Sequence, residues 1–325
     1  MPDFTNKIRQ TKITLREVGL REGLQSHSTV LTTDQKVELF RGLVQAGCKE
    51  INVVSFVGAT KMPQMADAEN LLRAIAPYAD GIDISGLVPN ERGLDRALAM
   101  KAEGVLDTAL MVFSISEEGM RANGMTASSE QLARQIERSA AASLAHGLKV
   151  VVFISGAFGD NFKGRVDPKL IIDHAANIAA FPGVDEILIS DSTGHADPLQ
   201  IHSFFTLLAE RLPVDRRIGL HMHDTRGAGL ANIAFALASP FEHFVLDSSF
   251  GGWGGDYPFV DDSFGNVPTE DLVEMLIGMG FETGIDVDAI LKVTRRYADF
   301  TGRGIGSKLH FSTGPLVWKR EQVSA

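Results

Sequence analysis

Two short stretches of the chain carry residue types that can bind a metal ion. Residues 220–224 read LHMHD, which spaces His221 and His223 two apart, and residues 17–25 read EVGLREGLQ, which sets Arg21 beside Glu22. Residues two apart on a strand project to the same face, so the two imidazoles would point the same way. With the Glu22 carboxylate and an amide oxygen from Asn266 they make a ligand set for a divalent cation. The alternative, two hydrogen-bonded histidines that cap a protein interior, is less favoured because acidic neighbours accompany the pair.

Arg21 also has two interpretations. An arginine next to a glutamate can be an exposed ion pair of little energetic consequence. At the end of a strand, the same guanidinium can hold a carbonyl oxygen while it becomes an enolate, as an oxyanion hole does. We favour the second interpretation because other polar residues stand at expected strand ends, namely Gln25, Asn52, Ser55, Ser155 and Asp191. For Asp191, a turn cap and a site residue are equally compatible with the sequence.

These residues are positioned by a repeated pattern of a β-rich run followed by a helical run. Eight strands are expected, at 13–18, 50–56, 82–88, 106–113, 149–155, 186–191, 217–223 and 243–248. Helices should begin near Asp34, Asp67, Glu91, Thr126, Asp167, Asp197, Arg226 and Thr269, several of which can cap free amides. Eight such units predict an α/β fold, a (β/α)8 TIM barrel, whose active site lies at the carboxyl ends of its strands.

The rest of the chain is expected to pack on this barrel or to cover its active site. Residues 1–283 should form the barrel domain, and residues 284–325 a C-terminal helical extension packed on the barrel or on a second subunit. The segment 250–266 is long and rich in glycine, which is typical of a lid rather than a simple connection. Trp253 within it would be costly to leave in water, so it should pack on something.

Composition narrows the functional classes. The formal net charge of -10 argues against nucleic acid as a partner. Cys48 is the only cysteine, so an intrachain disulfide is impossible, and its apolar surroundings favour a buried thiol over a reactive one. No apolar run approaches the length of a membrane span, and the first residues lack the apolar core of an export signal. We therefore expect a cytoplasmic protein with no membrane association.

Several motifs together resemble those of the hydroxymethylglutaryl-CoA lyases, members of the DRE-TIM metallolyase superfamily. They are EVGLREGLQ, SFVGATKMPQMAD, SDSTG, LHMHDTRGAGLANI, DSSFGGWGGDYP and GNVPTEDLV. The resemblance implies a (β/α)8 barrel that binds a divalent cation, Mg2+ or Mn2+, as its cofactor. It also implies an acyl-CoA substrate, cleavage of 3-hydroxy-3-methylglutaryl-CoA to acetyl-CoA and acetoacetate, and a homodimer.

By motif, the resemblance assigns the metal ligands to Glu22, His221, His223 and Asn266. Arg21 matches the catalytic arginine, and His221 is a candidate catalytic residue as well as a ligand. Gln25 and Asp191 match substrate-site positions, and we add Asn52 and Ser55 to the expected substrate-binding group.

Three positions depart from the family pattern. Glu22 replaces an aspartate, and Asn52 replaces a glutamate, which removes one negative charge. The family's loop motif G-G-C-P-Y contains a cysteine implicated in catalysis, whereas residues 254–258 read GGDYP, with one extra residue before Gly265. Asp256 can replace that thiol as an acid or base if burial raises its pKa.

The leading hypothesis is therefore a metal-dependent lyase that cleaves a carbon–carbon bond beside a CoA thioester. A related 3-hydroxyacyl-CoA such as citramalyl-CoA is an alternative substrate. A Claisen-type synthase or 2-oxo-acid aldolase of the same superfamily is an alternative enzyme, and a catalytically inactive CoA-binding paralogue is the non-enzymatic alternative.

Overall fold

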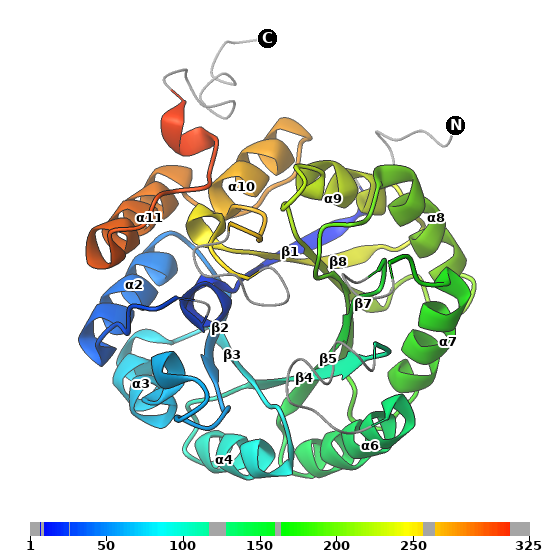
Figure 1. The fold of residues 1–325 in the computed structure, drawn as a ribbon, viewed down its shortest axis with the longest axis horizontal. Helices are drawn as coiled ribbons and strands as arrows, with labels where there is room; N and C mark the ends of the chain where they lie inside the picture. Colours follow the sequence, from blue (N-terminus) through cyan, green and yellow to red (C-terminus); the bar gives the residue numbers. More distant parts are fainter. Residues whose placement is uncertain are drawn as a thin grey trace.

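The computed structural model describes residues 7, 10–25, 27–116, 128–159, 164–255 and 264–312. Eight parallel strands form a closed barrel in which each strand pairs with the next and the last pairs with the first (Figure 1). The strands are β1 (Lys12–Glu17), β2 (Glu50–Ser55), β3 (Asp83–Leu87), β4 (Thr108–Ser114), β5 (Lys149–Ser155), β6 (Glu186–Asp191), β7 (Arg217–Met222) and β8 (His243–Ser248). The predicted (β/α)8 barrel is confirmed, with the largest difference at β4, which was expected from residue 106 and begins at Thr108.

Helices cover the outside of the barrel (Figure 1). They are α2 (Thr33–Gln45), α3 (Ala68–Ile75), α4 (Glu91–Ala102), α6 (Ser129–Ala145), α7 (Pro168–Ala179), α8 (Pro198–Leu208), α9 (Gly229–Leu237) and α10 (Thr269–Gly278). Asp167 and Asp197 cap α7 and α8 as expected, each accepting a hydrogen bond from a first-turn amide. Asp67 does not cap α3, because its carboxylate instead binds Lys36 and Thr33. Thr126 lies outside the described residues.

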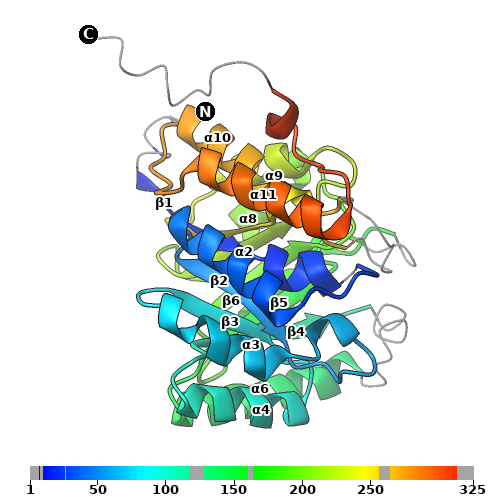
Figure 2. The same ribbon diagram turned by 90° about the vertical axis from the view of Figure 1, so that its left-hand side faces the viewer.

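A further helix, α11 (Val287–Thr301), lies between α2 and α10 in the outer ring (Figures 1 and 2). Asp286 caps its start, and its last turn ends at Gly302, which has a positive φ of 69°. Arg296 on this helix binds Glu38 on α2, with 2.6 Å between Nε and Oε1. Helix α11 therefore packs against two helices of the outer ring, while the division of the chain at residue 283 into a barrel and an extension stays a prediction.

The main hydrophobic core lies between the barrel and its helices and contains Cys48, whose side chain is buried. Burial raises the pKa of this thiol well above its ordinary value, which disfavours the nucleophilic thiolate. Within the described residues, no helix is both long and apolar enough to span a membrane.

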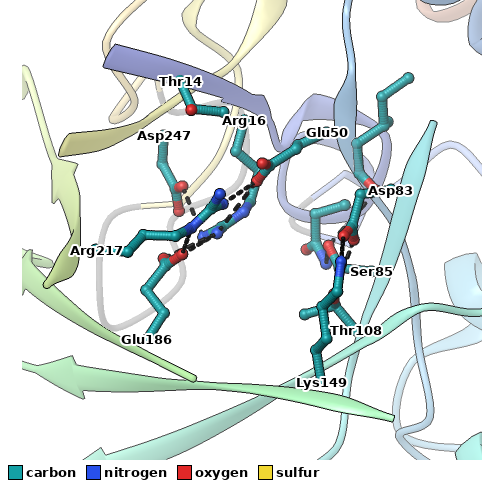
Figure 3. A network of polar contacts seen from close by, with 12 residues as sticks. Thr14, Arg16, Glu50, Asp83, Ser85, Thr108, Lys149, Glu186, Arg217 and Asp247 are labelled. Carbon is teal, nitrogen blue, oxygen red and sulfur yellow. Dashed lines mark hydrogen bonds and ion pairs between the residues drawn. The ribbon is translucent and has the colours of Figure 1, made fainter. Parts of the chain in front are cut away.

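The barrel interior holds a network of ion pairs centred on Arg16 of β1 (Figure 3). Arg16 lies 2.8 Å from Glu186 and 3.3 Å from Asp247, measured between the closest nitrogen and oxygen atoms. Arg217 binds Glu186 at 2.5 Å and also contacts Glu50. Removing one partner would leave an uncompensated buried charge, so each charged side chain of the network is needed to balance the others.

Two buried carboxylates hold the turns that follow the first and last strands. Glu17 accepts hydrogen bonds from the backbone amides of Gly19, at 2.7 Å, and Phe250, at 3.1 Å. Glu270 accepts from the amide of Gly251, at 3.0 Å, and from the Thr294 hydroxyl, at 3.1 Å. Burial disfavours the charged forms despite these bonds, and raises the pKa of Glu17 to about 8 and that of Glu270 to about 7.

We predict that the free energy of unfolding falls as the pH rises from about 5 to about 8. In this window the folded state keeps protons on Glu17 and Glu270 that the unfolded state releases, so each group lowers stability by up to about 1.4 kcal/mol per pH unit. Urea denaturation at several pH values would measure the slope, and Glu270→Gln should reduce it below pH 7. A slope that is the same in wild type and in this variant would contradict the prediction.

Candidate active site

The predicted metal ligands meet at the carboxyl end of the barrel. Arg21 and Glu22 lie on a short π-helical turn, η1 (Gly19–Gly23), which follows β1, and all five of its residues are buried. His221 is on β7 and His223 lies just beyond it, where it forms an isolated antiparallel bridge with Asn266. A π-helical turn is rare and is frequently found at functional sites.

Three donor atoms from these elements form a small triangle. His221 Nε2 and His223 Nε2 are 3.1 Å apart, and they lie 3.3 and 3.5 Å from Oε1 of Glu22. Donor atoms at adjacent corners of an octahedron with bonds of about 2.1 Å are about 3.0 Å apart. The triangle therefore fits one divalent cation, and it is a group of histidine and acidic side chains with metal-binding geometry among the described residues.

Asn266 lies beside this triangle because of a glycine. A Cβ atom on Gly254, which has a φ of 128°, would lie only 2.0 Å from Nδ2 of Asn266 and 3.2 Å from Cγ of Glu22. The Asn266 Nδ2 donates to the Trp253 carbonyl oxygen at 3.1 Å. The amide oxygen is then the atom that Asn266 can offer to a cation, and its role as a ligand stays a prediction.

The charges around Glu22 favour a ligand in its ionised form. Burial alone would raise the pKa of Glu22, but His221 and Arg21 overcome this effect and hold it well below its ordinary value. Burial alone would likewise lower the pKa of His221, but Glu22 and Asp247 overcome it and raise this pKa to about 9. A cation that binds here has to displace the proton of His221.

Arg21 is not an exposed ion-pair residue, because only 4% of Arg21 and 6% of Glu22 are accessible to solvent. Its NH2 lies 3.0 Å from Oε2 of Glu22, and its Nε donates to Oδ1 of Asn52 at 2.5 Å. Asn52 in turn donates to the Ser85 hydroxyl at 2.9 Å. Asn52 thus fixes the orientation of the arginine.

Arg21, Glu22 and His223 line a cavity of about 360 Å3. Gln25 and Ser155 also line it, and Oε1 of Gln25 is buried without a hydrogen-bond partner in the described structure, which supports a substrate contact. Ser55 is absent from the described lining, and its hydroxyl accepts from the Val57 amide at 3.4 Å.

Asp191 acts as a turn cap, the first of the two uses that its sequence allowed. Its two carboxylate oxygens accept hydrogen bonds from the amides of His195, at 3.0 Å, and Ala196, at 2.8 Å. The cavity is lined instead by the next residue, Ser192, which sequence reasoning missed. A substrate contact by Asp191 stays a prediction.

The loop after β8 is described as far as Gly255. Trp253 is fully buried, with its ring centroid 4.1 Å from that of Tyr297 on α11, and its indole nitrogen donates to the Gly304 carbonyl at 2.9 Å. The expected packing of Trp253 is therefore confirmed. Asp256, and with it the predicted acid or base, lies outside the described residues, as does residue 257.

Sequence reasoning also missed Asp247 on β8. Its Oδ2 lies 3.1 Å from Nδ1 of His221, while its Oδ1 binds Arg16 at 3.3 Å. When Nδ1–H donates to this carboxylate, Nε2 is left as the metal-binding atom. The available signal was an acidic residue near the end of an otherwise apolar strand, HFVLDS.

Comparison with known proteins places the chain among lyases. A family model described as HMGL-like matches residues 12–296. The chain is 32% identical over 299 residues to a hydroxymethylglutaryl-CoA lyase of Bacillus subtilis, covering 91% of this chain and 96% of the relative. It is 33% identical over 303 residues to the (R)-citramalyl-CoA lyase of Chloroflexus aurantiacus, covering 90% and 92%.

A solved structure shows the same similarity. An HMG-CoA lyase from Acinetobacter baumannii, in complex with coenzyme A and 3-methylmalate, superposes with a TM-score of 0.81 at 28% identity. The match covers 97% of this chain and 100% of the other.

We predict that Asp247→Asn weakens Mn2+ binding by about 10- to 100-fold, because the amide no longer fixes the tautomer and orientation of His221. Isothermal titration calorimetry measures the affinity. Asp83→Asn is a suitable control, since Asp83 also binds a lysine and a hydroxyl but lies at the start of β3, whereas the histidines lie at the end of β7. Wild-type affinity in Asp247→Asn would contradict the prediction.

Proposed function

The chain belongs to the HMGL-like family, and from this premise we propose that it is a divalent-metal-dependent lyase for a 3-hydroxyacyl-CoA. The substrate best supported by the relatives is 3-hydroxy-3-methylglutaryl-CoA, which would yield acetyl-CoA and acetoacetate. The observation that carries the proposal is the triangle of Glu22, His221 and His223 in a cavity that Arg21 also lines.

The metal ligands and Arg21 have different roles in the proposed reaction. A cation held by Glu22, His221, His223 and Asn266, for which we propose Mg2+ or Mn2+, would supply Lewis acidity that lowers the pKa of a substrate hydroxyl. A base removes the hydroxyl proton, the bond between C2 and C3 breaks, and the carbinol carbon becomes a ketone. The electron pair passes to the thioester as an enolate, which Arg21 stabilises until it takes up a proton at C2.

The proton-transfer groups are proposed from the sequence and the charges of the site. We propose that His221 takes part in catalysis as a ligand, with Nε2 on the cation and Nδ1 held by Asp247. We propose Asp256 as the replacement for the family cysteine, since it occupies the matching loop motif. Gln25, Asn52, Ser55 and Asp191 are kept as proposed substrate-site residues, with Asn52 acting through Arg21.

Citramalyl-CoA is the second candidate substrate. The similarity to a citramalyl-CoA lyase is as high as that to the hydroxymethylglutaryl-CoA lyase. The relative solved with coenzyme A and 3-methylmalate also supports a CoA thioester of a hydroxy acid. From the same relationships we propose a cytoplasmic homodimer.

The test of the function is release of acetyl-CoA from a panel of 3-hydroxyacyl-CoA esters with Mn2+ or Mg2+. We expect cleavage by wild type, loss of cleavage when the cation is chelated, and at least a 100-fold lower kcat/KM in His223→Ala, which removes a ligand. His146→Ala is the matched control, because His146 is exposed on the outer side of the barrel. Wild-type turnover in His223→Ala would remove this residue from the site.

Asp256→Asn is predicted to lower kcat by about 10²- to 10⁴-fold with little change in KM, because the amide cannot transfer a proton. Steady-state kinetics with the ester that wild type cleaves best measures both constants. Unchanged kcat would assign the proton transfer to another group.

A further inference from the structure

One wall of the active-site cavity is made of apolar side chains from three neighbouring strands. Leu87 is on β3, Leu110 and Val112 are on β4, and Phe153 is on β5. The strand register places Leu87 next to Leu110 and Val112 next to Phe153. Leu110 and Val112 are two apart, so they project to the same face, which is the inside of the barrel.

This apolar wall is separate from the main core. Its residues cluster with Val151 and Leu188, whereas the main core lies between the barrel and the helices. Leu110 and Phe153 are buried, while Leu87 and Val112 are half-buried and face the cavity. If these side chains only filled the centre of the barrel, no open cavity would lie beside them. Because they line the cavity, the wall has apolar surface that a ligand can contact.

The apolar wall lies at the depth of the metal ligands. The ring of Phe153 makes an edge contact with the imidazole of His221, with 5.1 Å between their centroids. The same cavity is also lined by polar groups, among them Arg21, Ser155 and Ser192. A substrate carbon held at the triangle of Glu22, His221 and His223 would therefore lie near both the polar groups and the apolar wall.

We propose that this wall binds the alkyl substituent on the carbinol carbon, and that the enzyme favours 3-hydroxyacyl-CoA esters in which this substituent is longer than methyl. The inference rests on the proposed function and names its substrate class. The four side chains of the wall offer no hydrogen bond, so a polar substituent would lose its water without replacement, whereas an alkyl chain gains by leaving water.

The pantetheine arm of CoA is the competing occupant of the wall. It fits less well, because its amide groups need hydrogen-bond partners that these side chains lack. The contact of Phe153 with His221 also places the wall beside the candidate metal ligands, where the reacting carbon rather than the arm would be held.

The experiment compares 3-hydroxy-3-methylglutaryl-CoA with 3-hydroxy-3-propylglutaryl-CoA, which would yield acetyl-CoA and 3-oxohexanoate. Because each buried methylene is worth up to about fourfold, wild-type kcat/KM for the propyl ester should exceed that for the methyl ester, by up to about 15-fold. Val112→Thr, which keeps the shape but adds a hydroxyl, should lower the propyl-to-methyl ratio about fivefold. Leu87→Phe should lower it further by filling the space.

Val214→Thr is the control, because Val214 is exposed and outside the cavity lining; it should keep the wild-type ratio. If wild type cleaves the propyl ester no better than the methyl ester, the inference is wrong and the proposed function stands. If Val112→Thr lowers kcat/KM for both esters equally, the wall binds a part common to both, and the inference is wrong. If neither these esters nor any other in the panel is cleaved, the proposed function fails and the inference with it.

Discussion

The site depends on one carboxylate, that of Glu22, which contacts three other side chains of the site. Oε1 of Glu22 faces both imidazoles, at 3.3 and 3.5 Å, while its Oε2 faces the guanidinium of Arg21 at 3.0 Å. These contacts keep a buried glutamate ionised against the cost of desolvation. They also fix where a cation and the arginine stand relative to each other. In the proposed reaction, the side chain that binds the cation therefore also sets the position of the developing enolate.

Closure of the barrel is what brings these groups together. Glu22 follows β1, the histidines belong to β7 and its end, and β8 between them supplies Asp247. Asp247 connects His221 to Arg16, and Arg16 connects to the acidic residues of the interior network. The ion pairs within the barrel thus support the orientation of His221, a candidate metal ligand, at its mouth. On the opposite side, β3 to β5 contribute an apolar surface instead, so a single ring of strands presents two kinds of wall to one cavity.

The sequence predicted the barrel and the meeting of Glu22, His221 and His223 because both follow from local patterns. Each β-rich run is followed by a helical run, and His221 and His223 share a face through their spacing alone. The bond between Asp247 and His221 depends on the register between strands, which no local pattern contains. The π-helical turn was also unpredicted: adjacent residues on a strand point to opposite faces, yet this turn lets Arg21 pair with Glu22 at the same mouth. The replacement of Asp191 by Ser192 in the cavity lining follows from the turn after β6, where Asp191 uses both oxygens to bind backbone amides.

The central claim is that Glu22, His221 and His223 hold one divalent cation. Anomalous diffraction from crystals of the full chain grown with Mn2+ tests it directly. A single strong peak within about 2.3 Å of Oε1 of Glu22 and of Nε2 of both histidines is the expected result. A peak bound by other residues, or no peak between these three atoms at saturating Mn2+, would contradict it.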